Sequence, residues 1–329
     1  MLNMRKKKII NAMVAIGASI GFASAVNAAT EIKTAFNQSE NHPQYKALQE
    51  FGKQLSAQTD GRYKINIFPN ELLGDQRASL ELVQNGAIQM AVVANPLVEN
   101  YDKDFGVLGL PYIYSGYDHQ EKVFTSGILD DLFAETRKMG FEVMTAYTGG
   151  ARSMYTKGGP ITSIEDMKGQ KIRVMQSDTM IKTLACMGGT GVPMGQGEVY
   201  SAVQQGVLDG AENSEITYFD LKQYEVAPYY STTQHLMVPD LVVASTYFLD
   251  SMSDADKATF NKLIKESTAN EFELWKEQIA ESKQAALDKG AKFNDVDITP
   301  FRDSCVSLQE ELVNTARQKD LYKKITALQ

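Results

Sequence analysis

One arginine interrupts an apolar strand pattern. In the stretch GQKIRVMQSD, residues 169–178, Arg173 stands between isoleucine and valine, and Ser177 or Asp178 can cap the helix that follows. Charged side chains are mostly exposed, so a solvated position on the strand is the simple alternative. A guanidinium at the carboxyl end of a strand, close to a helix N-terminus, can instead bind an anion. Its planar fork matches a carboxylate through two parallel hydrogen bonds, so the pattern favours a carboxylate site.

The other residue types that carry chemistry give weaker patterns. His42, His119 and His235 are not paired at metal-ligand spacing, and the sequence contains neither C-x-x-C nor H-E-x-x-H. The glycine-rich stretch GGTGVPMGQG has no G-x-G-x-x-G in register after a strand. We therefore expect no metal and no cofactor. Glu212 and Glu215 could form the carboxylate pair of a secreted glycoside hydrolase, which is the alternative from another functional class.

The N-terminus has the organisation of a secretory leader. Four consecutive cations, Arg5 to Lys8, precede an apolar run, and the tripeptide VNA places small residues before Ala29. We predict a signal peptide over residues 1–28. No later segment approaches the roughly 18 apolar residues of a membrane helix, so we expect the exported chain to be soluble.

The net charge of the exported chain limits the classes of partner that it can bind. Without the four leader cations, 29 of the 33 Lys and Arg remain against 41 Asp and Glu, which gives a net charge near −12. Such a surface argues against nucleic acid and anionic lipid as partners. A small anionic ligand is still compatible, because one cation in a cleft can decide its binding.

Two similar runs of strands and helices position these residues. In the first half we expect, in order, strand, helix, strand, helix and strand over 30–36, 41–62, 63–69, 78–86 and 87–94. In the second half we expect strand, helix, helix and strand over 167–175, 177–189, 197–206 and 207–213. This order implies parallel sheets with right-handed crossovers. The stretches LVQNGAIQMA and AVQQGVLDGA, starting at Leu82 and Ala202, share a helix end, a glycine and a strand. This similarity indicates two domains of similar strand–helix–strand build, and the alternative is that the shared pattern arose by chance.

Two such α/β units would face each other across a cleft, with Arg173 at a strand end that borders it. A helix from Ser253 to Lys289 would be ~50 Å long, so we expect it to bend or to pack across both units. We therefore predict an α/β fold of two lobes with a ligand cleft between them and a long C-terminal helix that bridges both.

The two cysteines, Cys186 and Cys305, are 119 positions apart. Export permits a disulfide between them. A single pair of cysteines far apart in the sequence is not typical of a small disulfide-rich fold. A hydrophobic core of this size needs no disulfide for its stability. Two free buried thiols are therefore the expectation, with a disulfide as the alternative.

An ordered set of motifs resembles a known family of transport proteins. The motifs are ELLGDQRASLELVQNGAIQMAV, LPYIY, TGGARSMYT, SIEDMKGQKIRVMQSD, PMGQGEVYSAVQQGVLDGAEN and QYEVAPYYSTTQH. Over nearly the whole exported chain they resemble the solute-binding proteins of tripartite ATP-independent periplasmic (TRAP) transporters, the DctP family. The resemblance implies a periplasmic-binding-protein-like protein that is not an enzyme. Such a protein closes two lobes around an organic acid and passes the acid to a sodium-coupled membrane permease.

The resemblance also suggests the organisation of the chain and its setting. We expect the first lobe to comprise residues 29–149 plus 239–278, and the second lobe residues 150–238 plus 279–329. The expected location is the periplasm of a Gram-negative bacterium. The expected partners are a small organic acid and the TRAP permease subunits, with no nucleic acid, and we expect a monomer.

In this family the arginine of the K-x-R-V strand clamps the ligand carboxylate, and Arg173 matches it. The resemblance implies further ligand contacts from both lobes, and it supports some of these residues less strongly than others. These candidate ligand contacts are Arg152, Asn213, Gln176, Asn37, Asp75 or Gln76, and, more weakly, His42, Gln196 and Asp240. For each of them an ordinary surface or capping role is the alternative.

Two positions narrow the class of acid. Gln196 stands where sialate-binding members often carry an aromatic residue, and Leu97 stands where they carry another arginine. The resemblance is therefore greater to members that bind hexuronates such as glucuronate or galacturonate. A C4-dicarboxylate is the alternative within the family, because Arg152 could serve a second carboxylate. The sequence does not separate transport from ligand presentation to a sensor.

Overall fold

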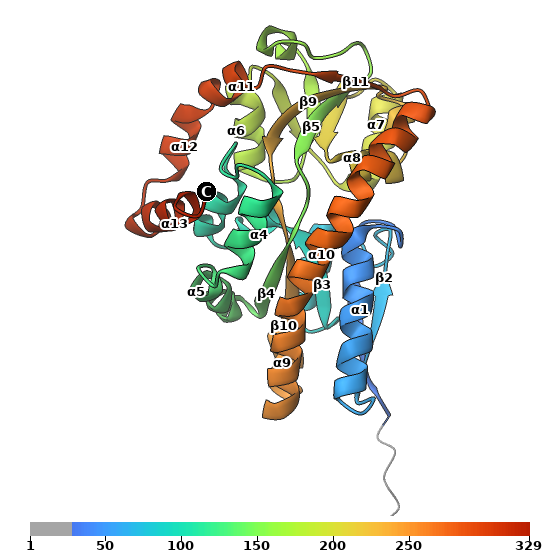
Figure 1. Cartoon of the computed structure of the whole chain (residues 1–329), viewed down its shortest axis with the longest axis vertical. Helices are drawn as coiled ribbons and strands as arrows, with labels where there is room; N and C mark the ends of the chain where they lie inside the picture. Colours follow the sequence, from blue (N-terminus) through green and yellow to red (C-terminus); the bar gives the residue numbers. More distant parts are fainter. Residues whose placement is uncertain (1–27) are drawn as a thin grey trace, which may run out of the picture.

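The computed structural model describes residues 28–329, which form two β-sheets flanked by helices (Figure 1). The strand order of the first sheet is β2-β1-β3-β10-β4. Its strands are β1 (Thr30–Ala35), β2 (Tyr63–Phe68), β3 (Met90–Ala94), β4 (Phe141–Thr148) and β10 (Pro239–Ser245). β1 pairs in parallel with β2 and β3, whereas β10 lies antiparallel between β3 and β4.

The second sheet has the strand order β11-β9-β5-β8-β6-β7. Its strands are β5 (Arg152–Thr156), β6 (Lys171–Val174), β7 (Thr190–Pro193), β8 (Gly210–Asn213), β9 (Tyr229–Leu236) and β11 (Lys292–Asp295). β6 is parallel to β7 and β8, but β5 is antiparallel to β8 and β9. The prediction of purely parallel sheets is therefore wrong. β5 and β10 each enter their sheet directly from the other sheet, without the crossover helix that a parallel neighbour needs.

Helices cover both sheets and define two lobes, each consisting of one sheet and the helices packed on it. Near the first sheet these are α1 (Pro43–Gln58), α2 (Gln76–Gln84), α3 (Asn95–Val98), α4 (Tyr117–Thr125), α5 (Asp130–Ala134) and α9 (Thr246–Ser251), with 3-10 helices η1 (Lys103–Gly109) and η2 (Glu135–Met139). The helices near the second sheet and in the C-terminal segment are α6 (Asp178–Cys186), α7 (Val199–Gln204), α8 (Glu215–Asp220), α11 (Thr299–Ser304), α12 (Val306–Leu312) and α13 (Ala316–Thr326). Three 3-10 helices accompany them, η3 (Ile164–Met167), η4 (Gln196–Glu198) and η5 (Gln223–Glu225). The four helices predicted in the two halves correspond to α1, α2, α6 and α7.

The long C-terminal helix, α10 (Asp254–Asp288), bridges the two lobes as predicted. It begins at Ser253, whose hydroxyl accepts a hydrogen bond from the Asp256 backbone N–H at 3.2 Å. Its first part packs on α1 and β4 of the first lobe, and it continues past α8 of the second lobe (Figure 1). Trp275, near the middle of this bridge, is almost completely buried.

Two short segments carry the chain between the sheets, residues 149–151 after β4 and residues 237–238 after β9. Gly150 has a φ of 77°, and a Cβ there would lie 2.4 Å from Cζ2 of Trp275. A Cβ on Gly149 would lie 2.6 Å from the carbonyl oxygen of Val238. Glycine is therefore required where the two crossing segments and α10 meet, because any side chain would push them apart.

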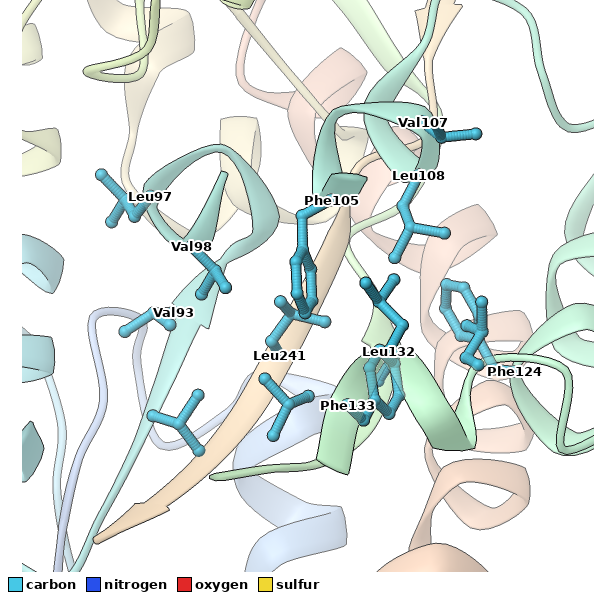
Figure 2. Packing of buried hydrophobic residues seen from close by; sticks show 14 of the residues in the cluster. Val93, Leu97, Val98, Phe105, Val107, Leu108, Phe124, Leu132, Phe133 and Leu241 are labelled. Atoms are coloured by element: carbon cyan, nitrogen blue, oxygen red, sulfur yellow. The ribbon is translucent and has the colours of Figure 1, made fainter. Parts of the chain in front are cut away.

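The largest apolar cluster of the first lobe fills the space between the sheet, η1 and α5 (Figure 2). Phe105 and Phe133 stack at its centre, with ring centroids 6.1 Å apart, and Leu132 and Leu241 pack around them. Leu321 and Ile325 of α13 belong to the same cluster. The last helix, which we expected in the second lobe, thus packs on the first. The residue boundaries of the lobes stay a prediction.

The leader predicted over residues 1–28 lies outside the described residues, apart from Ala28. None of the helices in residues 28–329 combines the length and the apolar character that a membrane crossing needs.

Cys186 and Cys305 form a disulfide, so the expectation of two free thiols is wrong. The Cα atoms lie 5.2 Å apart, at the end of α6 and at the junction of α11 and α12. Cys305 and Phe301 pack in one apolar cluster with Leu184 of α6, which brings the two cysteines together. The bond therefore attaches the C-terminal segment to the helix that follows Arg173.

The disulfide closes a long loop, so it should stabilise the fold. We expect the double variant Cys186→Ser/Cys305→Ser to lose about 2–4 kcal/mol of unfolding free energy, because the unfolded chain regains loop entropy. Urea unfolding of the oxidised protein and of the variant measures this difference. The wild type unfolded with reductant is the control and should match the variant. Equal midpoints for the oxidised protein and the variant would contradict the prediction.

Candidate ligand-binding site

A cavity that is partly open to solvent lies between the two lobes. Side chains of both lobes line it, and all ten residues predicted as ligand contacts are among them. These are Asn37, His42, Asp75, Gln76, Arg152, Arg173, Gln176, Gln196, Asn213 and Asp240. The structure therefore brings the whole predicted set together at one place, while their roles toward a ligand stay predictions.

The ends of parallel strands supply much of this lining. Asn37 follows the end of β1, Gln176 follows the end of β6, and Asn213 is the last residue of β8. Carboxyl ends of parallel strands are where α/β folds place their ligands. In this chain the strand ends of the two sheets border the same cavity, which explains how residues far apart in sequence meet there.

Arg152 is buried and already has a carboxylate partner. Its Nε and Nη2 donate to the two carboxylate oxygens of Glu212 at 2.5 and 2.8 Å, and Nη1 donates to Asn213 Oδ1 at 3.0 Å. Burial alone would raise the pKa of Glu212, but the charge of Arg152 and hydrogen bonds to that carboxylate lower it. Arg152 and Glu212 therefore form a neutral pair, and little positive charge is left for a ligand.

The carboxylates that suggested a hydrolase are not placed for catalysis in the cavity. Neither Glu212 nor Glu215 lines it. Glu212 is paired with Arg152, and Glu215 lies at the start of α8. Burial raises the pKa of Glu215. In the part of the chain that the structure describes, no group of three or more His, Cys, Asp or Glu side chains could hold a metal ion.

Arg173 is as deeply buried as Arg152 but has no carboxylate partner. The two side chains belong to residues that are 4% and 5% exposed, respectively. Nε and Nη2 of Arg173 donate to the carbonyl oxygen of Met194 at 3.0 and 2.8 Å, and Nη1 donates to Gln196 Oε1 at 3.2 Å. Within residues 28–329 no Asp or Glu oxygen lies within 4.0 Å of it. Burial lowers the pKa of Arg173, yet a guanidinium keeps its charge in proteins.

Neutral polar groups in the cavity lining are oriented by the fold. Gln76 Oε1 accepts a hydrogen bond from the Ala94 backbone N–H at 2.7 Å, which leaves its amide nitrogen as a donor. Gln196 turns its oxygen to Arg173, and its Nε2 is buried without a partner in the described chain. Burial lowers the pKa of His42 to about 3, so this ring is neutral. The lining thus offers amide and imidazole groups that suit hydroxyls.

Three carboxylates also line the cavity. Asp75 caps α2 by accepting a hydrogen bond from the Ala78 backbone N–H at 2.8 Å, and Asp240 accepts one from Gln44 Nε2 at 2.7 Å. The third, Glu71, was missed by the sequence analysis. It lies just after the end of β2, so the rule that strand ends border the cleft could have found it.

The lobes touch each other around the cavity. Glu99 accepts hydrogen bonds from the hydroxyls of Ser177 and Thr179 at the start of α6. Asn100 Nδ2 donates to the backbone oxygen of Gln176 at 3.1 Å. These contacts hold the segment after Arg173 against the first lobe.

Replacing Glu212 or Glu215 by neutral glutamine should change the stability of the fold in opposite directions. Glu212→Gln leaves the charge of Arg152 buried and unpaired, so we expect it to lose about 3–5 kcal/mol of unfolding free energy at pH 7. Glu215→Gln removes a carboxyl that burial disfavours as an anion, so we expect a gain.

The pH dependence tests the same assignment. The pKa of Glu212 falls from 4.5 to about 2 on folding, so its contribution is present above pH 4.5 and is lost toward pH 2. The deficit of Glu212→Gln should therefore shrink as the pH falls from 4.5 to 2. The raised pKa of Glu215 acts in the opposite direction, so the advantage of Glu215→Gln should disappear below pH 4.5. Urea unfolding at pH 7 and pH 3 measures both, and a destabilised Glu215→Gln at pH 7 would contradict this account.

Comparison with known proteins places this fold and cavity in one family. The profile of DctP, bacterial extracellular solute-binding protein family 7, matches residues 34–315. The uncharacterized protein YiiZ of Salmonella typhimurium is 34% identical over 287 residues, which cover 87% of this chain and 88% of that protein.

Solved structures agree with the sequence matches. A TRAP periplasmic solute-binding protein from Anaerococcus prevotii, solved with bound D-glucuronate, is 34% identical with a TM-score of 0.88, and the match covers 91% of this chain and 98% of that chain. One from Xanthobacter autotrophicus Py2, solved with β-D-galacturonate, is 30% identical with a TM-score of 0.87, covering 90% and 99%. With a matching family profile, two lobes and a cavity between them, the chain belongs to the DctP family of bacterial extracellular solute-binding proteins, which serve TRAP transporters.

Proposed function

We propose that this protein captures a hexuronate, such as glucuronate or galacturonate, in the cavity between its lobes and delivers it to a sodium-coupled TRAP permease. The observation that carries the proposal is the buried guanidinium of Arg173, whose donors meet only neutral oxygens in the described chain. A buried charge without a counter-charge is unfavourable, so a ligand carboxylate that joins it gains two charge-assisted hydrogen bonds and removes that cost.

The charge balance of the lining favours one carboxylate and several hydroxyls over a C4-dicarboxylate. Arg152 is neutralised by Glu212, so it is not available for a second ligand carboxylate. Glu71, Asp75 and Asp240 would repel such a group, and they can accept hydrogen bonds from hydroxyls. A hexuronate has this composition, and the relatives from A. prevotii and X. autotrophicus were solved with hexuronates.

The leader supports a periplasmic location. A chain with the predicted signal peptide would meet its ligand outside the inner membrane, where the related solved proteins are described as periplasmic. We propose binding and release of the acid without chemical change, so no catalytic group is assigned.

Replacing Arg173 tests the assignment. We expect Arg173→Met to reduce glucuronate affinity by at least 100-fold, since each charge-assisted hydrogen bond contributes about 1.5–3 kcal/mol. Arg173→Lys should lose at least tenfold, because an ammonium keeps the charge but not the planar fork. Isothermal titration calorimetry of the purified protein measures both variants.

The control is Arg302→Ala, which removes a positive charge from an exposed side chain of α11. Its affinity should equal that of the wild type. Without ligand, Arg173→Met should melt at or above the wild-type temperature, because it removes a buried unpaired charge. Unchanged glucuronate affinity in Arg173→Met would reject the proposal.

A further inference from the structure

A strained turn after β2 brings a glutamate into the cavity. Asn70 and Glu71 have φ values of 55° and 57°, in the left-handed region. Asparagine tolerates this conformation, but it is uncommon for glutamate. The backbone N–H groups of Asn70 and Glu71 donate to the carbonyl oxygens of Gln38 at 3.0 Å and Phe36 at 3.2 Å. The turn is therefore tied to the segment after β1, and strain that persists beside a cavity suggests a functional role.

The two carboxylate oxygens of Glu71 have different surroundings. Oε2 accepts a hydrogen bond from the backbone N–H of Gly197 in the opposite lobe at 3.2 Å. A Cβ on Gly197 would lie only 2.8 Å from that oxygen, so glycine permits the contact. Oε1 is buried and accepts no hydrogen bond from the described residues. One oxygen thus joins the lobes, and the other keeps its accepting capacity.

Glu71 is next to the groups that hold Arg173. Gly197 and Gln196 are both in η4, and Gln196 accepts a hydrogen bond from Arg173. Glu71 and Arg173 interact electrostatically, although no ion pair within 4.0 Å joins them in the described chain. Asp75, which also lines the cavity, adds a second negative charge near Glu71.

We propose that Glu71 is a specificity-determining residue that selects a hydroxyl-rich monocarboxylate. Oε1 accepts a hydrogen bond from a ligand hydroxyl close to the carboxylate that Arg173 holds, and its negative charge disfavours a ligand with a second carboxylate there. Because Oε2 contacts the opposite lobe, the same side chain links hydroxyl recognition to closure of the lobes. This inference rests on the proposed function of the cavity.

The test compares the affinities of glucuronate and succinate by isothermal titration calorimetry of the purified protein. Glu71→Gln keeps the size of the side chain but replaces an accepting oxygen by a donor and removes the charge. We expect glucuronate affinity to fall at least tenfold while succinate affinity stays equal or rises, so the ratio of the two falls at least tenfold. Glu198→Gln is the matched control, because it removes a glutamate charge from η4, the 3-10 helix that Glu71 contacts, but at an exposed residue outside the cavity lining.

Gly197→Ala provides a second variant that displaces the Glu71 carboxylate without altering any charge. It should also lower glucuronate affinity, and melting curves without ligand establish that each variant folds. A ratio within threefold of wild type in Glu71→Gln, or an equal change in Glu198→Gln, would overturn the role of Glu71 while leaving hexuronate capture intact. A wild-type protein that does not bind glucuronate would instead contradict the proposed function itself.

Discussion

The buried guanidinium of Arg173 is the constraint on which the binding site depends. Arg152 shows what a buried arginine in this protein otherwise requires, since Glu212 meets it with both carboxylate oxygens. Arg173 is buried to the same degree but is held by the backbone oxygen of Met194 and the amide oxygen of Gln196. Neutral acceptors fix the direction of the guanidinium without cancelling its charge. The site is therefore oriented in advance for an anion, and little reorganisation is needed when one arrives.

The rest of the fold holds two lobes around that charge while leaving them connected by narrow segments. Gly150, in the segment that crosses between the sheets after β4, packs against Trp275 of α10. Trp275 also lines the cavity, so the crossing segment and the bridging helix meet at the binding site. Next to it, the Thr148 backbone N–H donates to Glu271 of α10 at 3.0 Å, and the Thr148 hydroxyl donates to Gln120 at 2.6 Å. The first crossing segment is therefore joined to α10 by a buried hydrogen bond and by its packing against Trp275.

The C-terminal segment adds a further connection between the lobes. The disulfide fixes Cys305 to the end of α6, and α13 then packs its apolar face into the first lobe. His119 of the first lobe contacts the backbone oxygen of Ile325 through its ring nitrogen at 2.9 Å. The helix that follows Arg173 belongs to the second lobe, and it is thereby attached to the first lobe at both ends, through Glu99 at its start and through the C-terminal segment at its end.

Local patterns in the sequence were sufficient for the elements that we predicted and for the strand ends that border the cavity, but not for the antiparallel strands β5 and β10. Arg173 could be found because a charge in an apolar strand is conspicuous, and Ser253 because helix caps have a local signature. The disulfide and the pairing of Arg152 with Glu212 depend on which distant segments meet, so spacing alone did not reveal them. Glu71 was missed although its position just after the end of β2 is a local signal, because no glycine marks the left-handed turn that brings it to the cavity.

A crystal structure of the protein with glucuronate tests the central claim most directly. The account predicts a ligand carboxylate within about 2.7–3.2 Å of the Arg173 guanidinium, with the Arg152–Glu212 pair unchanged. A carboxylate bound to Arg152 in place of Glu212, or a bound sugar acid that does not contact Arg173, would contradict it.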